Sequence, residues 1–380
     1  MTDIETLTKK IEHNNQAFYR SEFTDPQTGN DTMKYNINGV SQFSSVRNTL
    51  TSSTLDKLGF YSPGTNLNLR YQNNSIIMDV IFTIKYNLSE FEIDKKGFTR
   101  VTTSNKVNLF ENSNALGLAI LTSTPYEDVK FDHLTLDNQT KFLNQLSNQQ
   151  LTYYYHLNAF SDDSVTTMGN RQTIKQDAST KMTKASYTVE VPADQQVYLT
   201  LANLNFTNQN YKELDITVQG KSYHYKTNNV FPFFNIGYFS TAQTITIEIN
   251  FPENSEVSYN TPEFYGLNLD NFQTAIATLQ NKNVETKVNG NFVTTNYNTE
   301  KDASLFYTIP YDKGWTATVN GRSVPIRQAQ TGFMAVDVKA GSGQVQLRFV
   351  PNGLFNGTIL SLIGSFSFII YHFFTNRKQK

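Results

Sequence analysis

The amino-acid sequence predicts an α+β, mainly β fold: an N-terminal mixed α/β region, tandem β-sandwich-like modules, and one C-terminal transmembrane helix. Three observations predict it. The chain is rich in aromatic residues, with 28 Phe and 21 Tyr, and these favour the pleated, half-buried surface of strands. Several segments alternate apolar and polar residues, as half-buried strands do. Residues 354–374 contain no Asp, Glu, Lys or Arg.

The first region, residues 1–150, mixes predicted helices and strands. Helices are expected where apolar residues recur at intervals of three or four and so share one face. At residues 135–149, Phe142, Leu143 and Leu146 form such a stripe. Two further helices are expected in this region, at residues 1–18 and 45–58.

The second region, residues 151–260, is expected to be a β-sandwich-like module with a preceding loop. Residues 151–180 are polar and show no strong periodicity, so they are assigned to the loop. The remainder contains three runs that alternate in the strand manner, at residues 187–191, 215–218 and 244–249.

The third region, residues 261–350, is expected to be a helix followed by a second β-sandwich-like module. The helix is predicted at residues 268–281 from an apolar stripe that comprises Leu269, Phe272, Ile276 and Leu279. Strands are predicted at residues 332–338 and 344–350. Asn320-Gly321 lies between two strand-like runs and predicts a hairpin, because a type I′ turn needs positive φ at both central positions.

The charge-free run at residues 354–374 is expected to cross a membrane, because a helix of this length is roughly 30 Å long at about 1.5 Å per residue. Three basic residues, Arg377, Lys378 and Lys380, follow this run closely. On its other side, Arg348 and Lys339 precede it. The positive-inside rule therefore predicts a cell-membrane protein with a single C-terminal span, a cytoplasmic tail at residues 375–380 and the bulk of the chain extracytoplasmic. The alternative is a buried amphipathic core helix.

Residues 1–10 contain no apolar stretch of the kind that a secretory signal peptide carries. We therefore expect that export of the body depends on an upstream region absent from this chain. The alternative is the opposite orientation in the membrane.

Composition and motifs exclude several classes of function. A formal net charge of −1 argues against nucleic-acid binding, which requires a basic surface. The absence of Cys excludes a disulfide framework, a thiolate metal site and a cysteine nucleophile. The chain has no glycine-rich phosphate loop, HExxH or GxSxG motif, and its five His stand at spacings unlike any metal-binding motif. No cofactor, metal site or catalytic residue is predicted.

The first candidate site combines aromatic rings with amide and charged groups: Tyr19, Arg20, Asn30, Asp31 and Asn38. One interpretation is sugar binding, because rings stack on the apolar face of a pyranose while amides and carboxylates bond its hydroxyls. The other is local structure, because Asn-Asp and Asn-Gly form turns and Arg20 would pair with Asp31.

The second candidate site comprises Tyr311, Asp312 and Trp315. This Trp is the only one in the chain; it follows a Pro-bounded turn and opens the predicted hairpin. It is either a platform for a glycan or a core residue that pins the turn of a β-sandwich.

The chain resembles the extracytoplasmic C-terminal portion of the YfhO-type bacterial membrane proteins. The matching motifs follow in the right order over nearly the whole chain, and the IPYDKGW block with its NG turn and trailing apolar helix is the most specific. They are FYRSE (18–22), ND (30–31), NINGVSQFSS (36–45), LDKLGF (55–60), IMDVIFTIKYNLS (77–89), NALGLAI (114–120), SLFYTIPYDKGWTATVNGRSV (304–324) and PNGLFNGTILSLIGSFSF (351–368).

The resemblance implies part of a multi-spanning GT-C-type glycosyltransferase, implicated in glycosylating teichoic or lipoteichoic acid from an undecaprenyl-phosphate sugar. The family's catalytic acid is expected on a loop between early membrane helices that have no counterpart here, so no catalytic residue is carried over. The implied role is to position the polymer acceptor or the lipid-linked donor. The implied partners are the bilayer, the lipid-linked sugar and a teichoic-acid-type glycan, and FYRSE, ND and IPYDKGW are signature positions of unknown role.

Two other functions stay open. A free-standing, membrane-anchored carbohydrate-binding or surface-interaction protein would be distinguished by the genomic sequence upstream of Met1. A glycosidase would need two carboxylates about 5–10 Å apart. Glu127-Asp128 and Asp162-Asp163 are adjacent carboxylates that could supply such a pair, whereas the alternative is that both pairs are solvated acids on loops.

Overall fold

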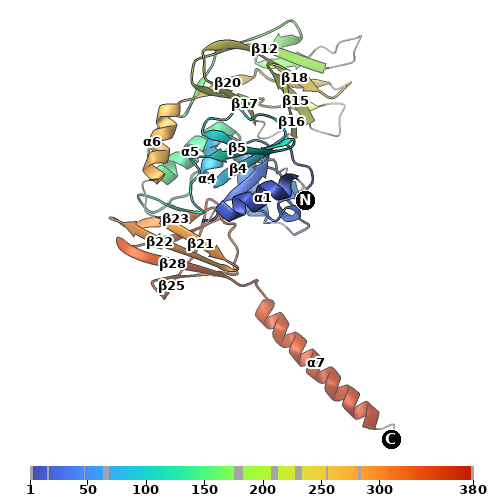
Figure 1. Ribbon diagram of the computed structural model, residues 1–380, viewed down its shortest axis with the longest axis vertical. Helices are drawn as coiled ribbons and strands as arrows, with labels where there is room; N and C mark the ends of the chain where they lie inside the picture. Colours follow the sequence, from blue (N-terminus) through green and yellow to red (C-terminus); the bar gives the residue numbers. More distant parts are fainter. Residues whose placement is uncertain are drawn as a thin grey trace.

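The computed structural model describes residues 3–14, 17–46, 48–62, 68–174, 183–206, 213–226, 233–253, 256–280 and 284–377. Strands account for 43% and helices for 23%, which confirms the predicted α+β, mainly β class. The modules follow one another along the long axis of the molecule (Figure 1). A β-sandwich lies at one end, the mixed α/β region in the middle, a second β-sandwich below it, and one long helix projects beyond.

The N-terminal region is built on a four-stranded sheet. One pair of neighbours, β1 and β4, is parallel and the others are antiparallel. The helix expected at residues 1–18 is confirmed as α1 (Asp3–Asn14), which buries Ile4, Leu7 and Ile11 in a small core. The sheet order is β1 (Arg20–Phe23), β4 (Ile84–Ser89), β6 (Val107–Asn112) and β5 (Phe98–Ser104). In the sequence, the segment that connects β1 to β4 includes the short elements α2 (Asp31–Lys34), β2 (Gln42–Phe43) and β3 (Asn68–Leu69).

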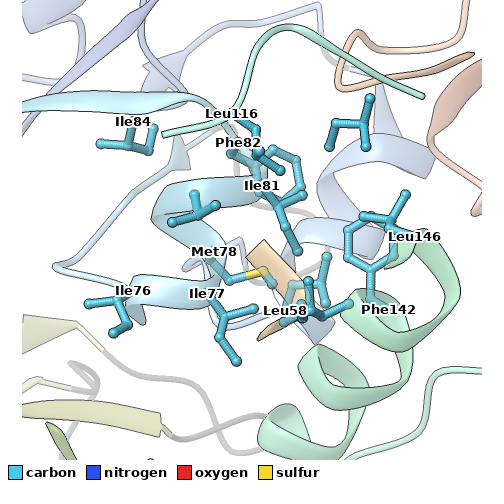
Figure 2. Packing of buried hydrophobic residues seen from close by; sticks show 14 of the residues in the cluster. Leu58, Ile76, Ile77, Met78, Ile81, Phe82, Ile84, Leu116, Phe142 and Leu146 are labelled. Carbon is cyan, nitrogen blue, oxygen red and sulfur yellow. The ribbon is translucent and has the colours of Figure 1, made fainter. Parts of the chain in front are cut away.

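The largest hydrophobic core is shared by four helices, and Phe142 and Leu146 pack there with Leu58 and Phe82 (Figure 2). Three of these helices confirm the helices expected at residues 45–58, 135–149 and 268–281. They are α3 (Thr49–Lys57), α5 (Thr135–Ser147) and α6 (Leu269–Gln280). The fourth, α4 (Ile76–Ile81), was not predicted, because all six of its residues are buried and leave no polar face for a pattern to reveal.

The first β-sandwich contains three sheets and its own core. One sheet is β16 (Lys221–Lys226), β15 (Glu213–Val218), β18 (Gln243–Phe251), β12 (Thr183–Val191) and β9 (Ala159–Ser161). The next is β17 (Phe233–Phe239), β13 (Gln195–Thr200), β20 (Glu263–Leu267) and β8 (Tyr154–His156). The last is β10 (Val165–Met168), β11 (Arg171–Ile174), β19 (Val257–Asn260) and β14 (Asn205–Phe206).

The strands expected at residues 187–191, 215–218 and 244–249 are confirmed within β12, β15 and β18. The loop expected over residues 151–180 is wrong for its described part, which contains β8, β9, β10 and β11. Each of these strands is only three or four residues long, too short to show a period. β8 and β9 are held by pairing with strands far along the chain.

The second β-sandwich has two sheets around a third core. Positive φ at Asn320 (49°) and Gly321 (77°) confirms the predicted hairpin turn, and β27 and β28 confirm the strands expected at residues 332–338 and 344–350. One sheet is β21 (Val284–Asn289), β22 (Phe292–Thr299), β28 (Gly341–Phe349), β24 (Trp315–Val319) and β25 (Arg322–Val324). The other is β26 (Arg327–Ala329), β27 (Phe333–Val338), β23 (Ala303–Tyr307) and β7 (Ala119–Leu121). The N-terminal region thus supplies β7 to this sandwich.

The C-terminal apolar run forms α7 (Leu354–Arg377), which projects away from the body (Figure 1). Its segment Leu354–Thr375 is long and apolar enough to cross a membrane, and none of it is buried. The alternative of a buried core helix is therefore wrong. Of the basic residues that follow the run, Lys378 and Lys380 lie outside the described residues.

Candidate functional site

Arg20 is buried and bonds to protein groups on two other segments. Its Nη1 donates to the carbonyl oxygen of Phe82 at 2.8 Å and to Oγ1 of Thr308 at 3.0 Å. Its Nη2 donates to the carbonyl oxygen of Thr308 at 2.7 Å. Burial lowers the pKa of Arg20 to about 10, so the guanidinium stays charged at neutral pH. Because Thr308 directly follows β23, Arg20 connects the N-terminal sheet to the second sandwich.

Asp31 and Asn30 stabilise the loop that follows β1. The Asp31 carboxylate accepts hydrogen bonds from Oγ1 of Thr28 at 2.6 Å and from the backbone N–H of Gln27 at 2.8 Å. The Asn30 amide bonds to the backbone of Phe43 in both directions, at 2.7 and 3.0 Å. These contacts match the local-structure interpretation of this group.

The expected ion pair between Arg20 and Asp31 is absent among the described contacts, since each residue has the other partners given above. Asn38 is exposed, and its carbonyl oxygen accepts from the backbone of Ser21 at 2.8 Å. Tyr19 packs edge-on against Tyr86, with ring centroids 5.5 Å apart.

The second candidate group forms the turn before β24. Trp315 packs on Phe349, with centroids 5.0 Å apart, at the edge of the third core. Its side chain is only partly buried, so the expectation of a core Trp is right only in part. The exposed Asp312 accepts a hydrogen bond at 2.7 Å from the backbone N–H of Gly314. The carbonyl oxygen of Tyr311 accepts from a side chain at 2.7 Å in the segment before α3.

A buried charged cluster holds α4 against its surroundings. Nζ of Lys95 lies 2.5 Å from Oδ2 of Asp79 and 2.7 Å from the Tyr71 hydroxyl, which donates to the other Asp79 oxygen. All three residues are at most 4% exposed. Burial raises the pKa of Asp79 to about 6 and lowers the pKa of Lys95, while each charge opposes the shift of the other. Because protein encloses all three side chains, the cluster stabilises the fold and does not reach a ligand from solvent.

A cleft of about 930 Å³ lies between the first β-sandwich and the N-terminal end of α5; we call it the α5 cleft. Its floor is one face of the sheet that contains β8 and β20. Tyr265 stands directly opposite His156 in the strand register, and alternate residues of a strand point to the same face. Tyr154 and Glu263 therefore share this face with them.

The walls of the α5 cleft come from segments far apart in the sequence. One wall is the start of α5 and the residues before it, where N-cap Leu134 makes no side-chain capping hydrogen bond. The buried Thr135 also lines the cleft, and its hydroxyl is one of the few buried side-chain groups without a hydrogen-bond partner in the described chain. Amide and hydroxyl groups from the first sandwich also line the cleft, two of them in turns and two at the end of β19 and directly after it: Asn170, Asn203, Asn260 and Thr261.

The floor of the cleft presents aromatic rings whose hydroxyl groups are fixed by hydrogen bonds within the protein. The rings of His156 and Tyr265 lie 4.6 Å apart, and the Tyr265 hydroxyl donates to Oε2 of Glu263 at 2.8 Å. The Tyr154 hydroxyl donates to Oε1 of the buried Gln139 at 2.6 Å, which fixes its ring at the cleft surface. Burial, followed by the hydrogen bond and charge of Glu263, raises the pKa of Tyr265, so this hydroxyl stays protonated at neutral pH.

The lining of the α5 cleft is acidic. Asp137 and Glu263 contribute carboxylates, and no Lys or Arg lies among the described residues that line it, although Nζ of Lys141 lies 3.2 Å from Oδ2 of Asp137. A second hollow of about 500 Å³ has the lining residue His156 in common with the cleft and includes Glu190, again without Lys or Arg among its described lining. Stacking surfaces beside hydroxyl, amide and carboxylate groups suit a neutral, hydroxyl-rich ligand better than a polyanion.

The α5 cleft contains none of the residues that the sequence singled out. A signal existed in the run Tyr153-Tyr154-Tyr155-His156, but it lies in the segment that was assigned to a loop. Among the residues that the structure describes, no group of three or more His, Asp or Glu is placed to hold a metal ion.

Comparison with known proteins identifies a family whose model spans most of the chain. A family model described as "Bacterial membrane protein YfhO" matches residues 1–361. An uncharacterized protein YfhO of Bacillus subtilis (strain 168) is 28% identical over 152 residues. That alignment covers 37% of this chain and 17% of the relative, so the chain matches only a small part of that protein.

Solved structures show only weak likeness. Arabinofuranosyltransferase AftD from Mycobacteria is 10% identical, with a TM-score of 0.19, over 74% of this chain and 31% of that one. A GH2 β-galacturonidase from Eisenbergiella tayi is 8% identical, with a TM-score of 0.17, over 53% of this chain and 38% of that one. Scores this low carry no argument about fold or function.

Proposed function

Because the chain belongs to the family of the bacterial membrane protein YfhO, we propose that it is the extracytoplasmic region of a membrane glycosyltransferase and holds a carbohydrate acceptor in the α5 cleft. Family membership and one exposed helix of spanning length support a location at the membrane. In this proposal the catalytic acid belongs to membrane-embedded parts outside the chain, and the chain's own task is to position substrate.

The observation that carries the proposal is the floor of the α5 cleft. Three rings line this floor, those of Tyr154, His156 and Tyr265. Beside them, the Glu263 carboxylate accepts a hydrogen bond from the Tyr265 hydroxyl at 2.8 Å. Sugar rings bind proteins through this combination, with stacking for the apolar face and fixed acceptors for the hydroxyls. The hydroxyl of Thr135 and the uncapped start of α5 add polar groups on the facing wall.

The charge of the lining specifies the part of the acceptor that binds. The Glu263 carboxylate repels phosphate groups and has no cation among the described lining residues, whereas Asp137 is paired with Nζ of Lys141 at 3.2 Å. For a teichoic-acid-type polymer, the proposal is therefore that the cleft takes neutral sugar units while the phosphates stay in solvent. The hollow that has His156 in common with the cleft gives room for a second sugar unit.

Ligand binding by the full chain in lipid nanodiscs tests this proposal. We expect neutral oligosaccharides to bind and polyglycerol phosphate without sugar substituents to bind at least about tenfold more weakly, a difference of about 1.4 kcal/mol. Tyr265→Ala removes the central ring and should lower the glycan affinity of the folded protein at least about tenfold; because the ring also packs against the largest core, thermal unfolding is measured alongside to score only folded protein.

Tyr238→Ala is the matched control. Tyr238 lies on β17 of the same sheet and also donates its hydroxyl to a carboxylate, that of Asp194, but it does not line the α5 cleft. Equal loss in both variants would contradict a specific role for the cleft. Preferential binding of the unsubstituted phosphate polymer would refute the charge argument.

The proposed orientation has a separate test, because the chain contains no Cys and a single introduced thiol reports one side of the membrane. Ser161→Cys lies on an exposed position of β9, and Gln379→Cys lies beyond α7. In cells that make the complete membrane protein, which supplies the upstream region expected for export, a membrane-impermeant maleimide should add label to Ser161→Cys in intact cells and to Gln379→Cys only after permeabilisation, each compared with the unsubstituted protein. The reverse pattern would overturn the extracytoplasmic placement.

A further inference from the structure

The last strand of the second sandwich leads almost directly into the spanning helix. The backbone N–H of Val350 still bonds to the carbonyl oxygen of Gly314 at 2.9 Å, and Leu354 already begins α7. Only residues 351–353 intervene, and fully extended they reach about 10 Å, whereas their own turn shortens them. The polar zone on each side of the hydrocarbon core is about 5–8 Å thick. The end of the sandwich therefore lies within reach of that zone.

The turn before β24 packs closely against this strand–helix junction. Gly314 has no room for a side chain, because a Cβ there would stand 2.3 Å from the carbonyl oxygen of Val350. The turn between β21 and β22 meets the same end, where the Asn291 amide donates to the carbonyl oxygen of Phe349 at 2.8 Å. Two turns and one strand end thus form a single surface around the start of α7.

Aromatic residues lie at this end of the sheet on both of its faces, because Arg348 and Phe349 are consecutive in β28 and point to opposite sides. Trp315 is paired with Phe349 across β24 and β28, and Phe292, 37% exposed, is paired with Arg348 across β22 and β28. In membrane proteins, amphipathic rings of this kind concentrate at the level of the lipid headgroups. None of these three rings lines the α5 cleft, so they are free of the proposed glycan site.

Basic side chains accompany the rings. Arg348 is exposed with its guanidinium 5.7 Å from the centre of the Phe292 ring, and Lys313 is exposed in the turn. Asp312, the acid in the same turn, accepts a backbone hydrogen bond from Gly314 at 2.7 Å. Long basic side chains at this level contact lipid phosphates while their stems cover apolar surface.

We infer that this end of the second sandwich, formed by Trp315, Phe349, Phe292, Arg348 and Lys313, rests in the headgroup region of the bilayer that α7 crosses. The bilayer, not a soluble partner, is the occupant because α7 fixes this surface beside the membrane. The second sandwich then serves as a base. The first sandwich, at the opposite end of the body in Figure 1, stands away from the lipid, and the α5 cleft lies between this sandwich and the start of α5.

The test uses Trp315, the only Trp of the chain, as a depth probe. The full chain is reconstituted into phosphatidylcholine–phosphatidylglycerol vesicles with lipids brominated near the top of the acyl chain. We expect bromolipid to quench Trp315 emission at least twofold and aqueous acrylamide to quench it weakly. Bromines placed deep in the acyl chain should quench less.

A matched control moves the probe. Trp315→Phe combined with Phe160→Trp places the only Trp on an exposed position of β9, in the first sandwich. Trp315→Phe combined with Phe292→Trp keeps it on the proposed surface. We expect the first control to respond to acrylamide alone and the second to behave like the wild type.

Quenching of Trp315 by acrylamide but not by any bromolipid would overturn the inference, because the surface would then face water. Protection from both quenchers would also overturn it, because protein would then cover the surface. Since Trp315 lies outside the α5 cleft, neither result bears on the proposed glycan binding.

Discussion

Removal of Lys95 from its buried pair should destabilise the N-terminal region and should do so increasingly as the pH rises. Lys95→Met keeps an unbranched apolar stem but leaves Asp79, whose side chain is 0% exposed, without its cation. Breaking a buried pair by removing one partner costs about 3–5 kcal/mol. The Tyr71 hydroxyl still donates to Asp79, so the variant loses the charge partner and not every contact of the carboxylate.

The pH dependence follows from the sign of the Asp79 shift. In the wild type, burial raises the pKa of Asp79 from 3.8 to about 6, and the Lys95 charge opposes that rise. Without Lys95 the folded-state pKa goes higher still. A carboxyl group with a raised pKa contributes stability that is present below its unfolded value and is lost as the pH rises through the folded value. Between pH 6.5 and 8, the variant should therefore lose up to about 1.4 kcal/mol per pH unit relative to the wild type.

Urea unfolding followed by circular dichroism at pH 6.5, 7.2 and 8 measures this slope. Lys95→Met combined with Asp79→Asn is the control, because it removes both charges and should restore a wild-type slope and part of the stability. The reasoning would be refuted by a Lys95→Met variant that loses less than about 1 kcal/mol and shows no added slope above pH 6.5.

Three further substitutions test other parts of the scaffold. Arg20→Met removes three hydrogen bonds and leaves buried carbonyl oxygens unpaired, so it should cost about 2–3 kcal/mol in urea unfolding, whereas Arg100→Met breaks only an exposed pair and should cost under about 1 kcal/mol. Gly321→Val forces a β-branched residue to a φ of 77° and should lower stability by about 1–2 kcal/mol in thermal unfolding, while Asn320→Gly should be nearly neutral. Trp315→Ala should cost about 2 kcal/mol in urea unfolding, below the 3–5 kcal/mol typical of a fully buried Trp, because its ring is partly exposed, and a larger loss would mean that it is a core residue.

Local pattern was sufficient for the elements that have two distinct faces. The apolar stripe of α5 and the alternation of β12 and β18 arise because each element buries one side only. Neighbouring residues therefore differ in polarity, which a sequence pattern reveals. It was insufficient for α4, where every side chain is buried and no contrast between faces exists. β7 was missed for another reason: its partner β23 lies almost two hundred residues further along the chain, so pairing and not pattern determines it.

The α5 cleft was beyond sequence reasoning because its walls meet only in the folded chain. The floor comes from β8 and β20, the facing wall from the start of α5, and the rim from turns around Asn170 and Asn203. Asn and Thr occur throughout this chain, so nothing in their local spacing distinguishes those that line a cleft. By contrast, the turn chemistry of Asn30 and Asp31 is local, and the sequence correctly allowed for it.

None of the signature segments FYRSE, ND and IPYDKGW lines the α5 cleft, so under the proposed function we expect them to act on it through the scaffold and not by contact. Arg20 connects the N-terminal sheet to Thr308, and the chain continues from there through the Trp315 turn to the strand–helix junction at Val350. This route joins the central region, on which α5 is packed, to the base from which α7 enters the membrane. Because protein interiors are close-packed and transmit strain, loosening Arg20 should change the position of the cleft relative to the bilayer more than the chemistry inside it. If the complete membrane protein is the proposed glycosyltransferase, Arg20→Met should accordingly leave glycan affinity of the folded chain within about twofold while lowering sugar transfer by the complete protein, and a matching loss of affinity would show instead that Arg20 supports the cleft directly.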